Sequence, residues 1–257
     1  MHIVISPAKT IDMKSKVPVS TYSVFMFTDE AEELAGILKQ KSREELKELM
    51  GISDSLAKLN YDRYRNWHFP FSDEEGRQAL FAFKGDVYAG LDAYNLPGGS
   101  IRFAQEHLFI LSGLYGLLRP LDMILPYRLE MGTKLKNPKG DNLYKYWGDK
   151  ITDAINEEME KNSSGILVNL ASNEYFKSIG LKKLKAKVIT PVFKNSKNGE
   201  YKVISIYAKR ARGLMTRFIL NNRITDPEEL NGFNEEGYYY NPNLSSPDMP
   251  VFTREYQ

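Results

Sequence analysis

Cysteine is absent from the 257 residues, and histidine occurs only three times. Without cysteine the chain can form no disulfide, no thiolate metal site and no cysteine nucleophile. The histidines, His2, His68 and His107, lie far apart and match no metal-binding spacing. Glycine-rich nucleotide loops and serine-hydrolase elbows are missing as well. We therefore expect no metal and no cofactor.

Long apolar runs and a secretory signal are also missing. No segment approaches the length of a membrane helix, and the start, MHIVISPAKTID, is typical of a strand followed by a turn. The hydrophobic content of 42% and the charged content of 26% are ordinary for a globular protein. These features predict a soluble, cytoplasmic protein with no membrane partner.

Charge is unevenly distributed, although the net charge is only +2. Residues 177–217 hold twelve Lys/Arg and one acid, whereas residues 224–253 hold six acids and no Lys or Arg. A basic segment suits a partner that carries phosphate groups. Charge counting alone favours the plainer explanation, a solvated surface.

Strand and helix patterns alternate along the chain without a repeat or a long linker. Buried strands are expected at 2–6, 79–83, 108–112 and 166–170, and a hairpin at 187–193 and 201–208 with its turn in NSKNGE. Helices are expected at 28–40, 42–51, 53–67, 73–80, 87–93, 101–105, 142–161, 209–221 and 227–230, with another beginning in ASNEYFKSI. Thr28 is the expected N-cap of the first helix, and Ser42 with Glu45 forms a capping-box pattern.

This alternation predicts a mixed α/β fold, that is, one α+β domain over residues 1–257. We expect a mixed central sheet, flanking helices, and a helical subsegment at 28–80 that projects from the sheet. The length would equally allow two small domains, but no linker separates them.

The stretch LKELMGISDSLAKLN brings two predicted helices together with almost no loop. It resembles the helix-hairpin-helix DNA-binding motif, here at about 42–67, with Gly51 as the first glycine, Ile52 as the central apolar residue and Ala57 as the small packing residue. Such a turn points backbone N–H groups and a helix N-terminus at phosphate and reads no base sequence. An ordinary helix corner containing glycine is the alternative.

Two residues depart from that motif. Ser53 replaces the second glycine and is also a good helix cap, and Asp54 places an acid beside the turn. Lys58 and Arg63 follow on the next helix and could meet phosphate.

Four motifs occur together and in order: ISPAKT, LSGLYGLLRPLDMILPYRLEMGTKL, NLASNEYF and KRARGLMTRFI. Over essentially the whole chain they resemble the YaaA family, bacterial proteins associated with peroxide stress and with limiting intracellular iron. The resemblance implies a single-domain α/β fold that binds DNA through a helix-hairpin-helix and a basic cleft. An effect on iron could then be indirect, because the sequence shows no iron site.

Several residues in these motifs are candidates for contact with nucleic acid. Lys9 follows the first strand, at the strand end where ligand clefts form in α/β sheets. Tyr115 could stack on a base, and Arg128 offers a planar fork for phosphate. Arg119 could contact phosphate or equally form a structural pair with Asp122.

Further candidates lie towards the C-terminus. Asn173 sits at a strand-to-helix turn that could bind an anion or simply cap the helix. The last basic helix contributes Lys209, Arg210, Arg212 and Arg217, which lie outside its apolar stripe and could be solvated or form a cleft wall.

Two functions follow. The first is a DNA-binding protein of the peroxide stress response that contacts duplex, structured or damaged DNA through its backbone. The alternative is an enzyme acting on a nucleotide or nucleobase, with candidate catalytic residues Lys9, Asp122 and Lys209, in which Lys9 could act as the nucleophile.

Overall fold

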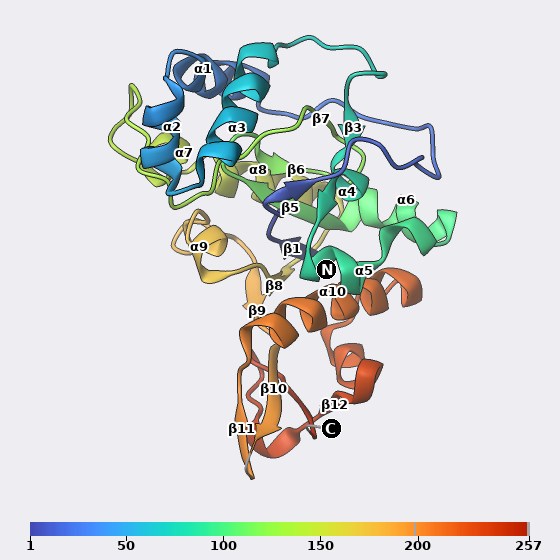
Figure 1. The fold of residues 1–257 in the computed structure, drawn as a ribbon. Coiled ribbons are helices and arrows are strands. Elements are labelled where there is room, and N and C mark those ends of the chain that lie inside the picture. Colours follow the sequence, from blue (N-terminus) through green and yellow to red (C-terminus); the bar gives the residue numbers. More distant parts are fainter. Residues whose placement is uncertain (198, 256–257) are drawn as a thin grey trace.

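A five-stranded sheet forms the centre of the molecule, and its strand order is β6-β5-β1-β8-β9 (Figure 1). The computed structural model describes residues 1–197 and 199–255. The strands are β1 (His2–Ile5), β5 (Leu108–Ser112), β6 (Gly116–Leu118), β8 (Ile166–Leu170) and β9 (Lys187–Ile189). Strand β6 is antiparallel to β5, and the other neighbouring pairs are parallel. The predicted mixed α/β class and mixed central sheet are confirmed.

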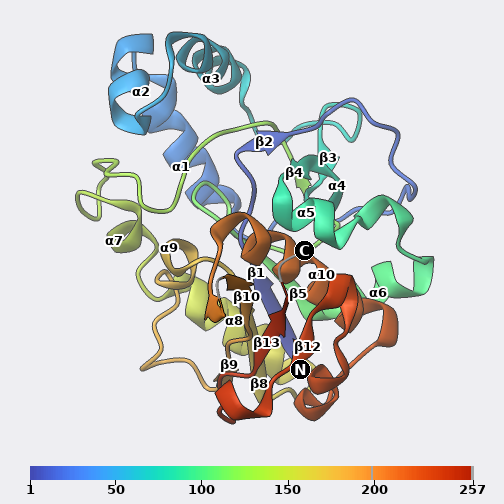
Figure 2. The same ribbon diagram turned by 60° about the horizontal axis from the view of Figure 1, so that its bottom comes forward.

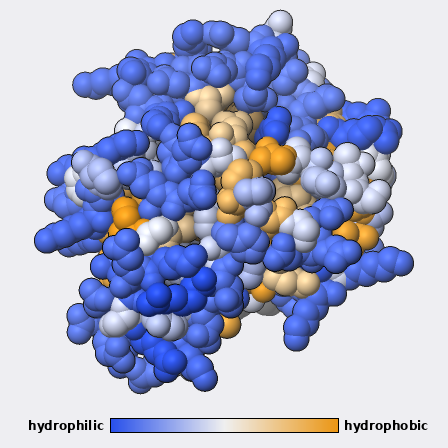
Figure 3. Space-filling view, turned by 90° about the horizontal axis from the view of Figure 1, so that it is seen from above, coloured by the Kyte–Doolittle hydropathy of each residue, from blue (hydrophilic) through white to orange (hydrophobic). Residues whose placement is uncertain are grey.

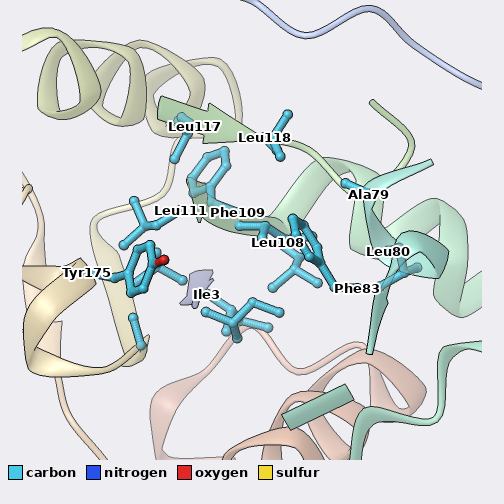
Figure 4. Packing of buried hydrophobic residues seen from close by; sticks show 14 of the residues in the cluster. Ile3, Ala79, Leu80, Phe83, Leu108, Phe109, Leu111, Leu117, Leu118 and Tyr175 are labelled. Atoms are coloured by element: carbon cyan, nitrogen blue, oxygen red, sulfur yellow. The ribbon is translucent and has the colours of Figure 1, made fainter. Parts of the chain in front are cut away.

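Strand β1 is the middle strand, and all four of its residues are buried. It pairs with β5 along one edge and with β8 along the other. A parallel strand covered on both faces is mostly apolar, which explains the apolar residues Ile3, Val4 and Ile5 that follow the buried His2. Figure 4 shows Ile3 among Leu108, Phe109 and Leu111, with Tyr175 at the side of the cluster.

Three helices stand together at one end of the molecule, as Figures 1 and 2 show: α1 (Thr28–Lys39), α2 (Arg43–Met50) and α3 (Asp54–Asn66). The capping box of α2 is confirmed, because Ser42 Oγ accepts from Glu45 N–H at 3.2 Å and Ser42 N–H donates to Glu45 Oε2 at 2.7 Å. Thr28 is not the N-cap of α1 but its first residue, and Phe27 precedes it.

A second sheet, with the order β11-β10-β13-β12, lies beyond the long helix α10 (Ser205–Asn222) in Figure 1. Its strands are β10 (Val192–Lys197), β11 (Glu200–Lys202), β12 (Tyr239–Tyr240) and β13 (Val251–Arg254). The rings of Phe193, Phe233 and Phe252 pack against one another beneath it. The expected helix at 227–230 is a 3₁₀-helix, Pro227–Gly232.

Shorter elements complete the chain. The helices are α4 (Ala79–Ala82), α5 (Asp86–Leu91), α6 (Gly98–His107), α7 (Leu143–Trp147), α8 (Lys150–Lys161) and α9 (Asn173–Phe176). The two-residue strands β2 (Thr10–Ile11) and β4 (Phe83–Lys84) pair with each other, as do β3 (Arg77–Gln78) and β7 (Met123–Ile124). Three further 3₁₀-helices are Ala93–Asn95, Glu235–Gly237 and Pro242–Leu244. Among the described residues, none of the helices combines the length and the apolar character that crossing a bilayer requires.

Two predictions around residue 80 are wrong. The expected strand 79–83 is mainly the helix α4, because its Ala and Leu residues favour helix and a short buried run has no distinguishing period. The expected helix 73–80 is a turn at 73–75 followed by β3. Ser72 closes that turn by donating from its N–H and its hydroxyl to Glu75.

Two later predictions are also wrong. The helix expected at 142–161 is broken into α7 and α8, because Gly148 ends α7 with a φ of 49°, which favours glycine. The hairpin is formed by β10 and β11 rather than by 187–193 and 201–208. Residues 205–208 begin α10, whose packing overrides the strand preference of Ile204 and Ile206. The predicted turn includes residue 198, which lies outside the described residues.

Candidate functional site

A cavity of about 410 Å³ opens where β1 and β8 end. The chain passes from β1 to β5 on one side of the sheet and later returns to β8 on the other, so the strand order reverses at β1. Ligands of open α/β sheets bind at the carboxyl ends of the strands at such a reversal. Ser6 and Ser172 follow the two strands and tie them together, since Ser172 N–H donates to Ser6 Oγ at 2.9 Å.

An ion-pair group forms one wall of this cavity. Glu130 accepts from Lys9 Nζ at 2.7 Å and from Arg128 Nη2 at 3.2 Å, one cation on each carboxylate oxygen. Lys9 keeps 63% of its side chain exposed, whereas Arg128 keeps 14%. The buried Nε of Arg128 has no hydrogen-bond partner among the described residues. Glu130 therefore holds two cations in place and leaves Lys9 in contact with solvent.

Helix α10 forms the opposite wall through Lys209 and Arg212. It crosses α5 so closely that a Cβ at Gly213 would lie 1.8 Å from the Val87 carbonyl oxygen, and a Cβ at Gly90 would lie 2.2 Å from the Arg210 carbonyl oxygen. Only glycine allows this approach. The crossing thus fixes the position of the two cations over the cavity.

Arg212 is partly buried, and its guanidinium has no ion-pair or hydrogen-bond partner in the described part of the chain. Burial lowers the pKa of its guanidinium from the ordinary value. Buried arginines usually have a carboxylate or another acceptor, because an unpaired buried charge is costly. An anion in the cavity would supply the missing acceptor.

Tyrosines line the inner part of the cavity. Tyr88 donates its hydroxyl to the Ser6 carbonyl oxygen at 3.1 Å, and the Tyr127 hydroxyl lies 2.7 Å from Ser112 Oγ. Burial raises the pKa of Tyr88, Tyr127 and Tyr175, so all three are neutral near pH 7. They offer hydroxyl groups and ring surface but no charge.

The lining as a whole carries a net positive charge. Five cations and three carboxylates belong to it: Lys9, Lys84, Arg128, Lys209 and Arg212 against Asp86, Glu130 and Glu174.

The α2–α3 turn has a geometry suited to phosphate. Gly51 ends α2 in the left-handed conformation with φ 57°, Ile52 is buried, and Ser53 caps α3 by accepting from Leu56 N–H. The N–H groups of Ser53, Asp54 and Ser55 have no acceptor among the described residues. Figure 3 looks down on this end of the molecule, where hydrophilic residues cover most of the surface and apolar ones gather near the middle.

The acid beside the turn is neutralised. Asp54 forms an ion pair with Lys47 at 2.8 Å, and both side chains are exposed. Ala57 is buried, as its predicted packing role requires, and Lys58 is exposed on α3.

Helix α3 connects this turn to the cavity. Tyr64 donates its hydroxyl to the Arg128 carbonyl oxygen at 2.6 Å and is almost fully buried. Arg63 is partly buried nearby; burial is the main cause that lowers its pKa, and the charge of Arg128 lowers it further. The α2–α3 hairpin is therefore tied to the cavity wall through the Tyr64 hydrogen bond.

Tyr115, Arg119 and Asp122 lie outside the cavity. Tyr115 is fully buried and packs edge-on against Phe25, so the prediction that it stacks on a base is wrong. Arg119 Nη2 pairs with Asp122 Oδ1 at 3.3 Å, and Ser23 donates to the same carboxylate at 2.6 Å. Burial raises the pKa of Asp122, which is fully buried. Arg119 and Asp122 therefore form the structural pair that was the alternative to a phosphate contact.

Two arginines of α10 are engaged elsewhere. Arg210 donates to both oxygens of Glu236, and Arg217 pairs with Asp92 at 3.0 Å. Neither lines the cavity. Asn173 is exposed at the start of α9, beside the lining residues of that turn.

The basic segment predicted at 177–217 divides into two parts. Lys183, Lys185 and Lys187 form ion pairs with acids on other elements, as a solvated surface would. Lys209 and Arg212 reach the cavity. Charge counting could not separate the two groups because partners come from distant parts of the chain.

The carboxylates of the site were not predicted from the sequence. Glu130 lies two residues after the candidate Arg128, and Glu174 follows the candidate Asn173. Asp86 is the first residue of α5. The pattern Arg128-x-Glu130 was the available signal, since it places an acid two residues from a candidate phosphate ligand. In the described part of the chain, no three His, Asp or Glu side chains are grouped so that they could hold a metal ion.

Comparison with known proteins gives consistent matches over the whole chain. Residues 1–244 match the family model described as peroxide stress protein YaaA. The chain is 55% identical over 256 residues to a UPF0246 protein of Hahella chejuensis, covering 100% of both chains. It is 52% identical over 255 residues to a UPF0246 protein of Teredinibacter turnerae, covering 99% of this chain and 100% of the other.

Proposed function

Because the chain belongs to the YaaA family of peroxide stress proteins, we propose that it acts in the peroxide stress response by binding the DNA backbone without sequence preference. The observation that carries this proposal is the convergence of Lys9, Arg128, Lys209 and Arg212 on one cavity. Segments far apart in the sequence supply these cations. Two of the four, Lys9 and Arg128, pair with Glu130, and of these two only Arg128 is largely buried.

The α2–α3 hairpin supplies a second contact in this proposal. Its turn exposes Gly51 and Ser53 and presents, at the start of α3, N–H groups that have no acceptor among the described residues. Backbone N–H groups at a helix N-terminus bind phosphate oxygens, and Lys58 and Arg63 follow on the same helix. Tyr64 holds α3 against the Arg128 segment, so hairpin and cavity would meet DNA as one surface.

Catalysis centred on Lys9 has weaker support. A nucleophilic amine must be neutral, and Lys9 forms a 2.7 Å ion pair with Glu130. Of the other candidate catalytic residues, Asp122 lies outside the cavity and Lys209 lies on its wall. We therefore place binding ahead of an enzyme acting on a nucleotide, and propose that any effect on intracellular iron is indirect, through protection of DNA.

The test is a fluorescence-anisotropy titration with labelled duplex, single-stranded and bubble DNA at 50 and 200 mM salt. Contacts to about four phosphates predict that duplex affinity falls about 100-fold between the two salt concentrations. Gly51→Asp should weaken binding at least tenfold, because a negative charge enters the turn. Gly51→Asn is the matched control, since it has the same shape, tolerates the left-handed conformation and carries no charge.

Absence of binding to every DNA at 50 mM salt would overturn the proposal. Equal losses for the Asp and Asn variants would remove the hairpin from it, because strain rather than charge would then explain the effect.

A further inference from the structure

We propose that the cavity at the ends of β1 and β8 binds a phosphomonoester, the group shared by a mononucleotide and a 5′-phosphorylated DNA end. This inference deepens the proposed function and rests on it in one respect, that the same cavity faces nucleic acid. An internal phosphodiester of a duplex is a different ligand, because the backbone continues on both sides of it.

The charge of the lining favours the monoester. Its five cations exceed its three carboxylates by two. A phosphomonoester carries about −1.5 to −2 at pH 7, whereas a phosphodiester carries −1. The lining therefore neutralises a terminal phosphate and would remain positive around an internal one.

The arrangement of those charges points the same way. Both oxygens of Glu130 are engaged by Lys9 and Arg128, so this carboxylate orients cations more than it repels an anion. Arg212 and Lys209 have no carboxylate partner among the described residues. Arg212 is the group that most needs an acceptor, since its guanidinium is partly buried and pairs with no group in the described part of the chain. A guanidinium fork and a phosphate with three terminal oxygens match in geometry.

The volume of the cavity and its remaining polar groups indicate what the ligand carries besides its phosphate. A volume of about 410 Å³ lies within the range of small-molecule sites and suits one nucleotide. The Ser6 hydroxyl donates to Ser172 Oγ at 3.3 Å, which leaves the Ser172 hydroxyl hydrogen to donate to a phosphate oxygen. The neutral rings of Tyr88, Tyr127 and Tyr175 lie on the inner side, where a sugar or base can pack.

Calorimetry with unlabelled ligands tests the chemistry. The four 2′-deoxynucleoside 5′-monophosphates are titrated into the full chain, and the four nucleosides without phosphate serve as references. We expect at least one monophosphate to bind at least tenfold more tightly than its nucleoside, as a charge-assisted contact to a partly buried arginine requires. In Arg212→Gln and in the exposed Lys209→Gln this ratio should fall towards one. Arg102→Gln, the same change on exposed α6, should keep it.

A second arm identifies the source of the phosphate. Anisotropy compares a stem-loop DNA that carries a 5′-phosphate with the same DNA that carries a 5′-hydroxyl. A tenfold preference for the phosphorylated end, lost in Arg212→Gln and kept in Gly51→Asp, assigns the site to DNA ends. Monophosphate binding without that preference assigns it to free mononucleotides.

The inference and the proposed function fail separately. If DNA binds but no monophosphate exceeds its nucleoside and the two stem-loops bind equally, the phosphomonoester site is overturned while DNA binding stands. If no DNA binds but a monophosphate binds in an Arg212-dependent way, DNA binding is overturned while the site stands. Thermal unfolding of each variant checks that a loss of binding does not come from misfolding. If Arg212→Gln fails to fold, the exposed Lys209→Gln still tests the site.

Discussion

Gly213→Ala should push α5 and α10 apart and so test how the cavity is built. The added Cβ would lie 1.8 Å from the Val87 carbonyl oxygen, and ordinary contact begins at 3.4 Å. The helices must therefore separate by about 1.6 Å at this point, the difference between those two distances. The opposing atoms belong to backbone, so no side chain can rotate away.

The magnitude follows from two opposing effects. Overpacking of a filled core typically costs about 1–3 kcal/mol, and contact between two backbones belongs at the upper end of that range. Replacing a helix glycine by alanine returns about 1 kcal/mol of helix stability. We expect Gly213→Ala to lower the free energy of unfolding by about 1–2 kcal/mol.

Urea unfolding at pH 7 measures this change, with Gly36→Ala in α1 as the matched control. A Cβ at Gly36 meets no atom within 4 Å, so this variant should gain about 0.5–1 kcal/mol from helix propensity alone. Gly213→Ala should also weaken ligand binding, because Lys209 and Arg212 move with α10. Stability of Gly213→Ala equal to or above that of Gly36→Ala would refute the argument that close helix approach positions the cations.

Three further predictions concern stability. Tyr64→Phe removes the 2.6 Å hydrogen bond to the Arg128 carbonyl oxygen and should cost about 1 kcal/mol in urea unfolding, whereas a change within error would show that water replaces the hydroxyl. Burial is the main cause that lowers the pKa of His2 from 6.5 to about 4, so between these two pH values the unfolded chain binds a proton that the folded chain does not. The free energy of unfolding should therefore fall as the pH drops from 6.5 towards 4, by about 2–3 kcal/mol at pH 4.5. This loss should be absent in His2→Gln. Gly116→Ala would place alanine at a φ of +67°, which strains its backbone, and its Cβ would lie 2.6 Å from the Trp147 ring. Because both effects act together, this variant should lower the thermal unfolding midpoint more than Gly213→Ala does.

Local signals predicted the parts of the fold that local physics decides. The Ser42 capping box, the end of α2 at Gly51 and the buried strands β1, β5 and β8 all depend on neighbouring residues or on a plain apolar run. The run ALFAF was mistaken for a strand because its environment, and not its own pattern, decides between helix and strand.

The candidate site was predictable in part, where chain position and residue type both pointed to a cation. Lys9 and Arg128 follow from chain position and residue type, and both line the cavity. Whether an arginine meets a carboxylate is a property of the assembled structure: Arg210 meets Glu236, whereas Arg212 meets none among the described residues. Tyr115 shows the same limit, since an aromatic beside a glycine belongs equally to a surface or to a core.

The central place of β1 has a consequence during synthesis on the ribosome. Its partner β5 emerges roughly 100 residues later and β8 roughly 160 residues later, which at 5–20 residues per second leaves one edge of β1 unpaired for about 10–30 s. For that time a nascent chain displays the three apolar residues of HIVI with open backbone groups, a target for chaperones or for other chains. The strand at the centre of the finished sheet is therefore also a segment exposed to aggregation while the protein is being made.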